Sequence, residues 1–190
     1  MRNRLSLIPD PHIGWLNGWI PIALLGLTDG IVFLLFPRDV VQRLFDRSGW
    51  PKKKVILTVI SKVVALGCLI LLIFSPIKSY RFLFPLGLSI VVLGLVGMVV
   101  ALINFKNTPP GEPVSRGIYK ISRHPQIVMS SLVLLGACMM VGSWAALILL
   151  ISARVLGHFS ILAEEQVCLK TYGQDYRKYM DQVPRYFLFF

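Results

Sequence analysis

Charged residues are scarce in this 190-residue sequence: Lys, Arg, Asp and Glu make up 15% of it, whereas hydrophobic residues make up 55%. The apolar residues form continuous runs instead of recurring at helical spacing, and the mean hydropathy is +0.69. This pattern excludes an ordinary soluble domain. The sequence therefore predicts an integral membrane protein.

Acidic residues are the scarcest charged residues, with 9 Asp and Glu against 20 Lys and Arg. The formal net charge of +11 might suggest a nucleic-acid partner, but the basic residues sit at the ends of apolar segments and form no stripe with interleaved aromatic residues. Membrane topology explains them more simply. We therefore expect membrane lipids as partners, no nucleic acid and no obligate protein partner.

Cysteine is also rare, and Cys68, Cys138 and Cys168 are odd in number and lack metal-ligand spacing. Two of them fall in apolar runs, where cysteine behaves as a small hydrophobic residue. We expect no disulfide and no metal site.

The first residues contain no short apolar stretch ending in a small-residue cleavage site, so we expect no removable signal peptide.

Five apolar segments indicate an all-α membrane bundle, in which a crossing needs about 20 residues. A short amphipathic stretch near Val40 and Phe45 predicts an interfacial helix after the first span. Gly142-Ser143-Trp144 predicts a tight turn, so the last two spans form a helical hairpin. We expect a single membrane domain, 1–190, with a three-helix part over 1–103 and a second part over 104–190. The expected spans are 13–36, 55–74, 82–103, 127–141 and 144–163.

The basic residues select an orientation for these five spans. Fourteen Lys and Arg lie in the first loop, the 104–126 segment and the C-terminal tail, whereas the opposite side carries only Arg2, Arg4, Lys78 and Arg81. By the positive-inside rule, the first group faces the cytoplasm. The N-terminus is then outside, and the C-terminus is cytoplasmic.

The stretch Gly117-Ile-Tyr-Lys-Ile-Ser-Arg-His-Pro125 carries much of the polar chemistry. Pro125 is suited to the first turn of a helix, so Arg123 and His124 would lie at a helix mouth. Unpaired backbone N–H groups and the helix dipole favour an anion there. A simpler alternative is that Ser122 caps the helix and Arg123 reaches toward lipid headgroups.

The tail after Glu164 is the second informative stretch. Aromatic and apolar residues recur in it at three- and four-residue steps, which predicts a helix with one face on the membrane that covers the cytoplasmic end of the bundle. Glu164 and Glu165 stand where the last span emerges. Adjacent carboxylates on a helix point about 100° apart, so at most one readily faces a shared site; the alternative is a solvated helix start.

In this order and spacing, the motifs resemble the isoprenylcysteine carboxyl methyltransferase and phospholipid methyltransferase superfamily. The resemblance covers about the last 85 residues. Its parts are Gly117-Ile-Tyr119, Arg123-His124-Pro125, the hairpin, Glu164-Glu165, and Tyr172-Gly-x-x-Tyr-x-x-Tyr-x-x-x-Val-Pro-Arg185.

The resemblance implies a cytosol-facing S-adenosylmethionine pocket closed by the tail, with a lipophilic acceptor entering from the bilayer. It implies that Arg123 is the catalytic-site arginine, and we expect it and His124 to contribute little to packing. Tyr119, His124 and Glu165 are candidates for a general base. The implied cofactor contacts are Asn104, Gly111, Glu112, Pro113, Val114, Tyr119, His124, Pro125, Gln126, Ile127 and Glu164.

Two departures leave the acceptor open. Carboxyl methyltransferases of this group have an arginine at the position of Ser160 and often a tyrosine at that of Ile127. Arg154, deeper in the last span, is an alternative site for an anionic headgroup. A prenylcysteine-like carboxylate, a phospholipid amine and a small thiol remain candidate acceptors.

Two other functions are compatible with parts of the sequence. An NADPH-dependent sterol-type reductase has a similar multi-span body and a tyrosine-rich tail, and a non-catalytic membrane protein would use the basic face to bind anionic lipid.

Asp29 and Lys62 lie about 10 Å below the same interface on neighbouring spans. We expect them to form a structural ion pair, because single charges are costly within a span; the alternative is that one of them lines the acceptor tunnel.

Overall fold

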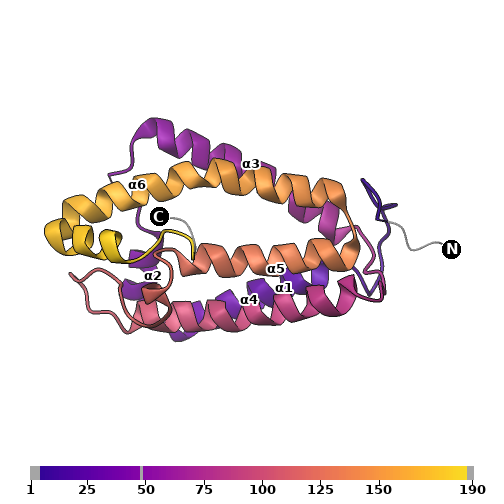
Figure 1. Ribbon diagram of the computed structural model, residues 1–190, viewed down its shortest axis with the longest axis horizontal. Helices are drawn as coiled ribbons and strands as arrows, with labels where there is room; N and C mark the ends of the chain where they lie inside the picture. The colour runs from indigo at the N-terminus through magenta and orange to yellow at the C-terminus, as the bar shows by residue number, and fades with distance from the viewer. Residues whose placement is uncertain (1–4, 48, 188–190) are drawn as a thin grey trace.

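The computed structural model describes residues 5–47 and 49–187, without the side chains of residues 52 and 53, and its helices run back and forth along one axis (Figure 1). The helices are α1 (Trp19–Leu35), α2 (Arg38–Phe45), α3 (Lys52–Ile73), α4 (Leu83–Lys106), the 3-10 helix η1 (Gly117–Lys120), α5 (Pro125–Val141) and α6 (Trp144–Gln182).

The helices match the predicted all-α membrane bundle. Helices α3, α4 and α6 are long and apolar enough to cross a bilayer, and α1 and α5 are shorter apolar helices of 17 residues each. At 1.5 Å per residue, 17 residues span about 25 Å, somewhat less than the hydrocarbon core. The interfacial helix predicted after the first span is α2.

Glycines bring α4 and α5 into close contact. A Cβ atom added to Gly87 would lie 2.8 Å from the backbone oxygen of Gly136, and one on Gly94 would lie 2.8 Å from that of Met129. Side chains do not fit at such distances, so these positions allow the two backbones to approach.

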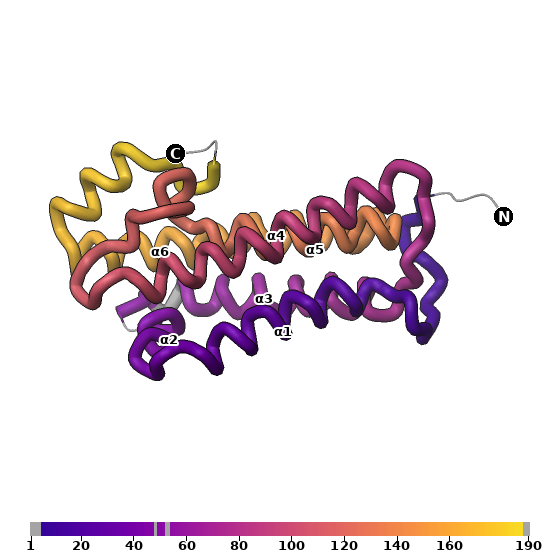
Figure 2. The backbone as a smooth tube through the Cα atoms, turned by 90° about the horizontal axis from the view of Figure 1, so that it is seen from below, coloured from indigo at the N-terminus to yellow at the C-terminus, as the bar shows by residue number. Residues whose placement is uncertain are grey.

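The predicted helical hairpin forms, but its two helices diverge. Gly142 adopts φ 71°, and the Ser143 hydroxyl accepts a hydrogen bond from the Ala146 N–H at 3.2 Å to start α6. Helix α5 then packs along α4, whereas α6 packs along α3 (Figures 1 and 2). Space for a cavity therefore remains between the two arms of the hairpin.

The first span begins later than predicted, at Trp19 instead of residue 13. The Asn17 side chain is buried and donates to the backbone oxygens of His12 and Ile73, and the Gly18 N–H donates to the Ser75 oxygen at 3.0 Å. These bonds to the turn after α3 keep the preceding chain out of the helix.

The predicted ion pair between Asp29 and Lys62 is wrong: within the described part of the chain, these two side chains do not meet. Lys62 is exposed on α3, and the Oδ1 atom of Asp29 is buried without a hydrogen-bond partner. Equal depth along two helices does not bring side chains together when they point in different directions.

The segments that carry most of the basic residues gather at one end of the bundle. Helix α2, the loop before η1 and the end of α6 all lie at the left in Figure 1, and the N-terminal segment lies at the opposite end. Arg2 and Arg4, which entered the orientation prediction, are outside the described residues. The arrangement agrees with the charge grouping on which that prediction depends.

Candidate active site

The C-terminal tail folds back over the start of α5. Helix α6 is broken at Gly173, which has φ 55° and ψ −124°, a conformation that favours glycine. The chain after the break reverses direction and returns toward η1 (Figure 2). The Tyr179 hydroxyl donates to the Tyr119 carbonyl at 2.7 Å, and the Arg123 N–H donates to the Pro184 carbonyl at 3.0 Å. The predicted covering of this end by the tail is confirmed.

The sequence predicted that the aromatic face of the tail lies on the membrane, and this prediction is wrong. The aromatic face points into the protein. Tyr176, Tyr179 and Val183 are buried in one cluster against Tyr172 and Met180. Helical periodicity identifies an apolar face but not what covers it. Here the aromatic face closes the polar site.

Glu165 is the centre of this site. Its carboxylate lies between Arg185, whose Nη2 is 2.7 Å from Oε2, and Arg123, whose Nε is 3.0 Å from Oε1. His124 Nε2 is 3.4 Å from Oε1. The Arg123 contact is ionic and poorly aligned as a hydrogen bond, whereas Arg185 Nε donates to both carboxylate oxygens at 3.1 Å. We call Glu165, Arg123, His124 and Arg185 the Glu165 cluster.

The cluster fixes the charge of Glu165. Burial alone would raise its pKa, but the close approach of His124, the hydrogen bonds from Arg185 and the charge of Arg123 outweigh it and lower the pKa to about 2. Glu165 is therefore ionised at neutral pH and bound by cations on both oxygens. A carboxylate in this state is a weak base and is suited to holding the three basic residues in place.

Arg123 and His124 contribute to packing, contrary to prediction. Both are buried, and Arg123 Nη1 donates to the Met180 carbonyl at 2.9 Å, which ties the tail to the start of α5. Ser122 does not serve as the cap envisaged in the simpler alternative, because His124 holds that position and the Ser122 hydroxyl donates to the Arg185 carbonyl at 2.9 Å.

Glu164 differs from Glu165 in that its carboxylate is accessible from outside the cluster. Its side chain is 51% exposed, and its Oε2 lies 4.0 Å from His124 Nδ1. No arginine among the described residues pairs with it. As predicted for adjacent carboxylates, only one of the two is buried in the cluster. Glu164 is left free to bind a cation or a diol at the mouth of α5.

Polar groups from the preceding segment line the same end. Gln126 Nε2 donates to the Tyr119 hydroxyl at 3.0 Å, and burial raises the pKa of Tyr119 far above its ordinary value. Tyr119 therefore stays protonated and is a poor general base. Gly117, with φ 59°, contacts the Asn104 side chain so closely that a Cβ would overlap it, and Asn104 Nδ2 is buried without a partner.

The other expected cofactor contacts are less closely joined to the cluster. Gly111, Glu112, Pro113 and Val114 lie in the loop between α4 and η1, where exposed Glu112 pairs with Arg116 at 3.5 Å. Pro125 and Ile127 form the first turn of α5, and Ile127 also lines the cavity described next.

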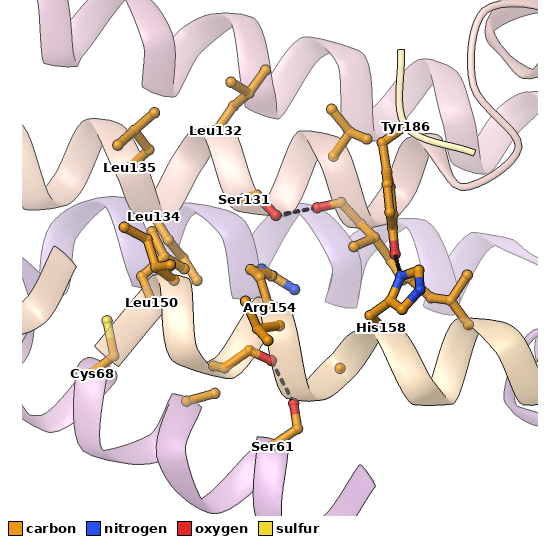
Figure 3. A pocket seen from close by; sticks show the side chains of 18 of the residues that line it. Ser61, Cys68, Ser131, Leu132, Leu134, Leu135, Leu150, Arg154, His158 and Tyr186 are labelled. Atoms are coloured by element: carbon orange, nitrogen blue, oxygen red, sulfur yellow. Dashed lines mark hydrogen bonds between the residues drawn. The ribbon is translucent and has the colours of Figure 1, made fainter. Parts of the chain in front are cut away.

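A cavity of about 790 Å³ lies between α3, α5 and α6, deeper in the bundle than the Glu165 cluster. Figure 3 shows apolar residues such as Leu134 and Leu150 at one side, Arg154 in the middle and His158 beside Tyr186 at the other side. Most of the lining is aliphatic, so the cavity suits a lipid chain.

Arg154 is the charged group of this cavity. Its Nη2 donates to the Ser130 hydroxyl at 3.2 Å, and its Nε is buried without a partner. No acidic side chain among the described residues pairs with it. Ser160, the other residue expected at the acceptor, instead shares a 2.6 Å hydrogen bond with Thr58 of α3 and is absent from the described lining.

Sequence reasoning missed His158 and Tyr186. His158 Nδ1 lies 2.9 Å from the Tyr186 hydroxyl, and both residues line the cavity. Burial raises the pKa of Tyr186 to about 12, although the adjacent Arg185 opposes this. The available signal was the spacing of Arg154, His158 and Glu165 at four and seven residues, which places them on one face of a helix.

Together, the bundle, the polar cluster under the tail and the adjoining apolar cavity define a helical membrane protein in which a buried polar cluster lies beside an apolar cavity. The family model of phospholipid methyltransferase matches residues 60–175, and the chain belongs to that family. The protein is therefore a membrane methyltransferase. A search of curated proteins found no significant match.

Proposed function

We propose that the protein transfers a methyl group from S-adenosylmethionine to a lipophilic acceptor that occupies the cavity between α3, α5 and α6. The observation that carries this proposal is the adjacency of two unlike sites on α6. One is the exposed carboxylate of Glu164 beside the mouth of α5, and the other is the apolar cavity with its unpaired Arg154.

The residues around Glu164 fit the cofactor. S-adenosylmethionine brings a methyl group on a sulfonium, together with a carboxylate, an ammonium and a ribose diol. The start of α5 favours an anion through its dipole. Glu164 offers a half-exposed carboxylate to a cation or a diol, and the buried, unpartnered Asn104 Nδ2 offers a donor. In this proposal the Glu165 cluster holds His124 and the tail in position around the ligand.

The acceptor site follows from Arg154. A buried guanidinium without an acidic partner is costly in an apolar environment, and a bound anion would offset that cost. We therefore propose an acceptor with an apolar chain and an anionic group. An acceptor that carries no proton on its nucleophile requires only alignment with the methyl group and exclusion of water, and the mostly aliphatic cavity would hold such an acceptor away from water.

The proposed orientation places the Glu165 cluster, the tail and the loop before η1 in the cytoplasm. This follows from the positive-inside rule applied to the basic end of the bundle. We further propose that the protein acts on a membrane-dissolved substrate without an obligate protein partner.

Calorimetric titration of the purified protein with S-adenosylmethionine and with NADPH tests the cofactor. Binding of the first ligand alone supports the proposal, binding of NADPH would indicate a reductase, and binding of neither would leave a lipid-binding function. For the acceptor, Arg154→Met is expected to raise KM for an anionic acceptor at least tenfold while leaving the cofactor Kd unchanged. A normal KM would remove Arg154 from the acceptor site.

A further inference from the structure

Methylation of a nucleophile that carries a proton requires a base, and the residues first considered for this role are poorly suited to it. Glu165 is bound by two arginines, and Tyr119 is buried and hydrogen-bonded to Gln126. His124 is held between Glu164 and Glu165, at 4.0 and 3.4 Å. None of these three residues lines the acceptor cavity that the structure describes.

His158 is differently placed. It lies on α6 one turn from Arg154, about 6 Å along the axis, and on the side of Arg154 that leads toward Glu164. It lines the cavity, and among the described residues the hydrogen-bond partner of its ring is the Tyr186 hydroxyl, which lies 2.9 Å from Nδ1 (Figure 3). It therefore stands between the proposed anion site and the proposed cofactor site, where the acceptor nucleophile must lie.

We propose that His158 is the general base of methyl transfer and that Tyr186 is its positioning residue. This inference rests on the proposed function. The Nδ1–H group of His158 donates to the Tyr186 oxygen, which leaves the lone pair of Nε2 directed at the acceptor. With the proton on Nδ1, the contact with Tyr186 would hold the ring in place while Nε2 accepts a proton.

An ammonium acceptor must lose a proton before its nitrogen can attack. The ammonium gives one proton to His158 Nε2, and the freed amine attacks the methyl carbon. The new nitrogen–methyl bond forms as the methyl–sulfur bond breaks, the sulfonium becomes a neutral thioether, and the product is a methylammonium. The imidazolium then loses its proton to water when the product leaves. A carboxylate acceptor has no proton to remove, so His158 is dispensable for it.

The tail connects the base to the Glu165 cluster. Arg185 binds Glu165, and the next residue, Tyr186, binds His158. The charged and titratable groups around His158 are Tyr186 and Arg185 from the tail, His124 from the start of α5, and Arg154 and Glu165 from α6. Docking of the tail therefore orders both the base and the cluster.

The activity test uses radiolabelled S-adenosylmethionine with phosphatidylethanolamine, dodecanethiol or N-acetyl-S-farnesylcysteine in detergent micelles. His158→Gln is expected to lower kcat at least 100-fold for an amine or thiol acceptor at pH 7. The loss should shrink at pH 9 to 10, where more of the acceptor is already deprotonated. His12→Gln is the matched control, because His12 is exposed, bonds through its N–H to the Phe74 carbonyl at the end of α3, and is not among the described lining residues of the cavity.

The outcomes separate the two proposals. Failure of the wild-type protein to methylate any of the three acceptors would count against the proposed function itself. Wild-type transfer to the carboxylate alone, or unchanged kcat and pH profile in His158→Gln with the amine, would overturn the role of His158 while leaving the methyltransferase intact. Retained calorimetric binding of S-adenosylmethionine by His158→Gln shows that the variant is folded.

A second readout does not depend on turnover. The sequence contains only three histidines, so ¹⁵N spectra of histidine-labelled protein can be assigned with the two Gln variants. We expect His158 to carry its proton on Nδ1 and to change tautomer in Tyr186→Phe, with a lower kcat. A proton on Nε2 in the wild type would overturn the proposal, because that atom would have no lone pair for the acceptor.

Discussion

Replacing Glu165 and Glu164 separately by Gln gives a matched test of the site, since the two changes are chemically identical and one residue apart. Glu165 is 4% exposed and bound by basic groups, whereas Glu164 is 51% exposed and unpaired with any described arginine. Glu165→Gln should therefore lower stability, and Glu164→Gln should lower affinity for the cofactor.

The magnitude for Glu165 follows from its pKa. Burial opposes ionisation, but the close approach of His124, the hydrogen bonds from Arg185 and the charge of Arg123 lower the pKa from 4.5 to about 2. At 1.36 kcal/mol per unit this corresponds to about 3 kcal/mol. Because the pKa is lower in the folded state, this stabilisation is complete above pH 4.5 and is lost as the pH falls toward 2. Glu165→Gln should thus cost about 3 kcal/mol at pH 7, and its difference from wild type should shrink between pH 4.5 and 2.

The assay is unfolding by SDS titration of protein in dodecyl maltoside micelles, followed by circular dichroism, at pH 7 and pH 3. Glu164→Gln should stay within about 0.5 kcal/mol of wild type but raise the Kd for S-adenosylmethionine about 10- to 100-fold, the effect of losing a charge-assisted hydrogen bond. Equal stability losses in the two variants, or a Glu165→Gln difference that does not depend on pH, would refute this reasoning.

Two further predictions concern the bundle. Gly136→Ala should destabilise the bundle by roughly 1–3 kcal/mol, because the added Cβ would overlap the Gly87 oxygen. The control Gly26→Ala should have little effect, because no atom lies within 4 Å of the added Cβ. Equal losses of stability for the two variants in the same SDS assay would contradict close packing as the cause. Asp29→Leu should raise stability by roughly 1 kcal/mol, since it removes a buried carboxylate oxygen without a partner. Lys62→Leu should change the stability little. Destabilisation by Asp29→Leu would instead mean that the Asp29 carboxylate stabilises the folded protein.

The helices could be predicted because each apolar run ends at a strong local signal. Gly142 and Ser143 mark the turn of the hairpin, and Pro125 marks the start of α5. The start of α1 could not be predicted, because the cause lies in long-range bonds from Asn17 and Gly18 to the turn after α3. Composition describes hydrophobicity but not these tertiary hydrogen bonds.

The part of the site that could be predicted is the part built from motifs that follow one another in a recognisable order along the sequence. Arg123, His124 and Glu165 do meet, but the sequence did not show that they also hold the tail. The aromatic face of the tail was assigned to lipid because periodicity cannot distinguish lipid from protein as the covering surface. His158 was overlooked because a single histidine in an apolar run is uninformative until Tyr186 is seen beside it.

The geometry of α6 explains how one helix serves both proposed sites. Arg154, His158 and Glu165 follow one another at four and seven residues, so they share a face and are separated by about 6 Å and 10 Å along the axis. Hydrogen bonds from Ser61 to the Ala153 carbonyl and between Thr58 and Ser160 fix the opposite face to α3. Helix α5 is held against α4, so the polar face of α6 is left toward the cavity instead of packing on its hairpin partner. The spacing between the proposed anion site, base and cofactor site is therefore set by the part of α6 before Gly173, and docking of the tail would complete the arrangement.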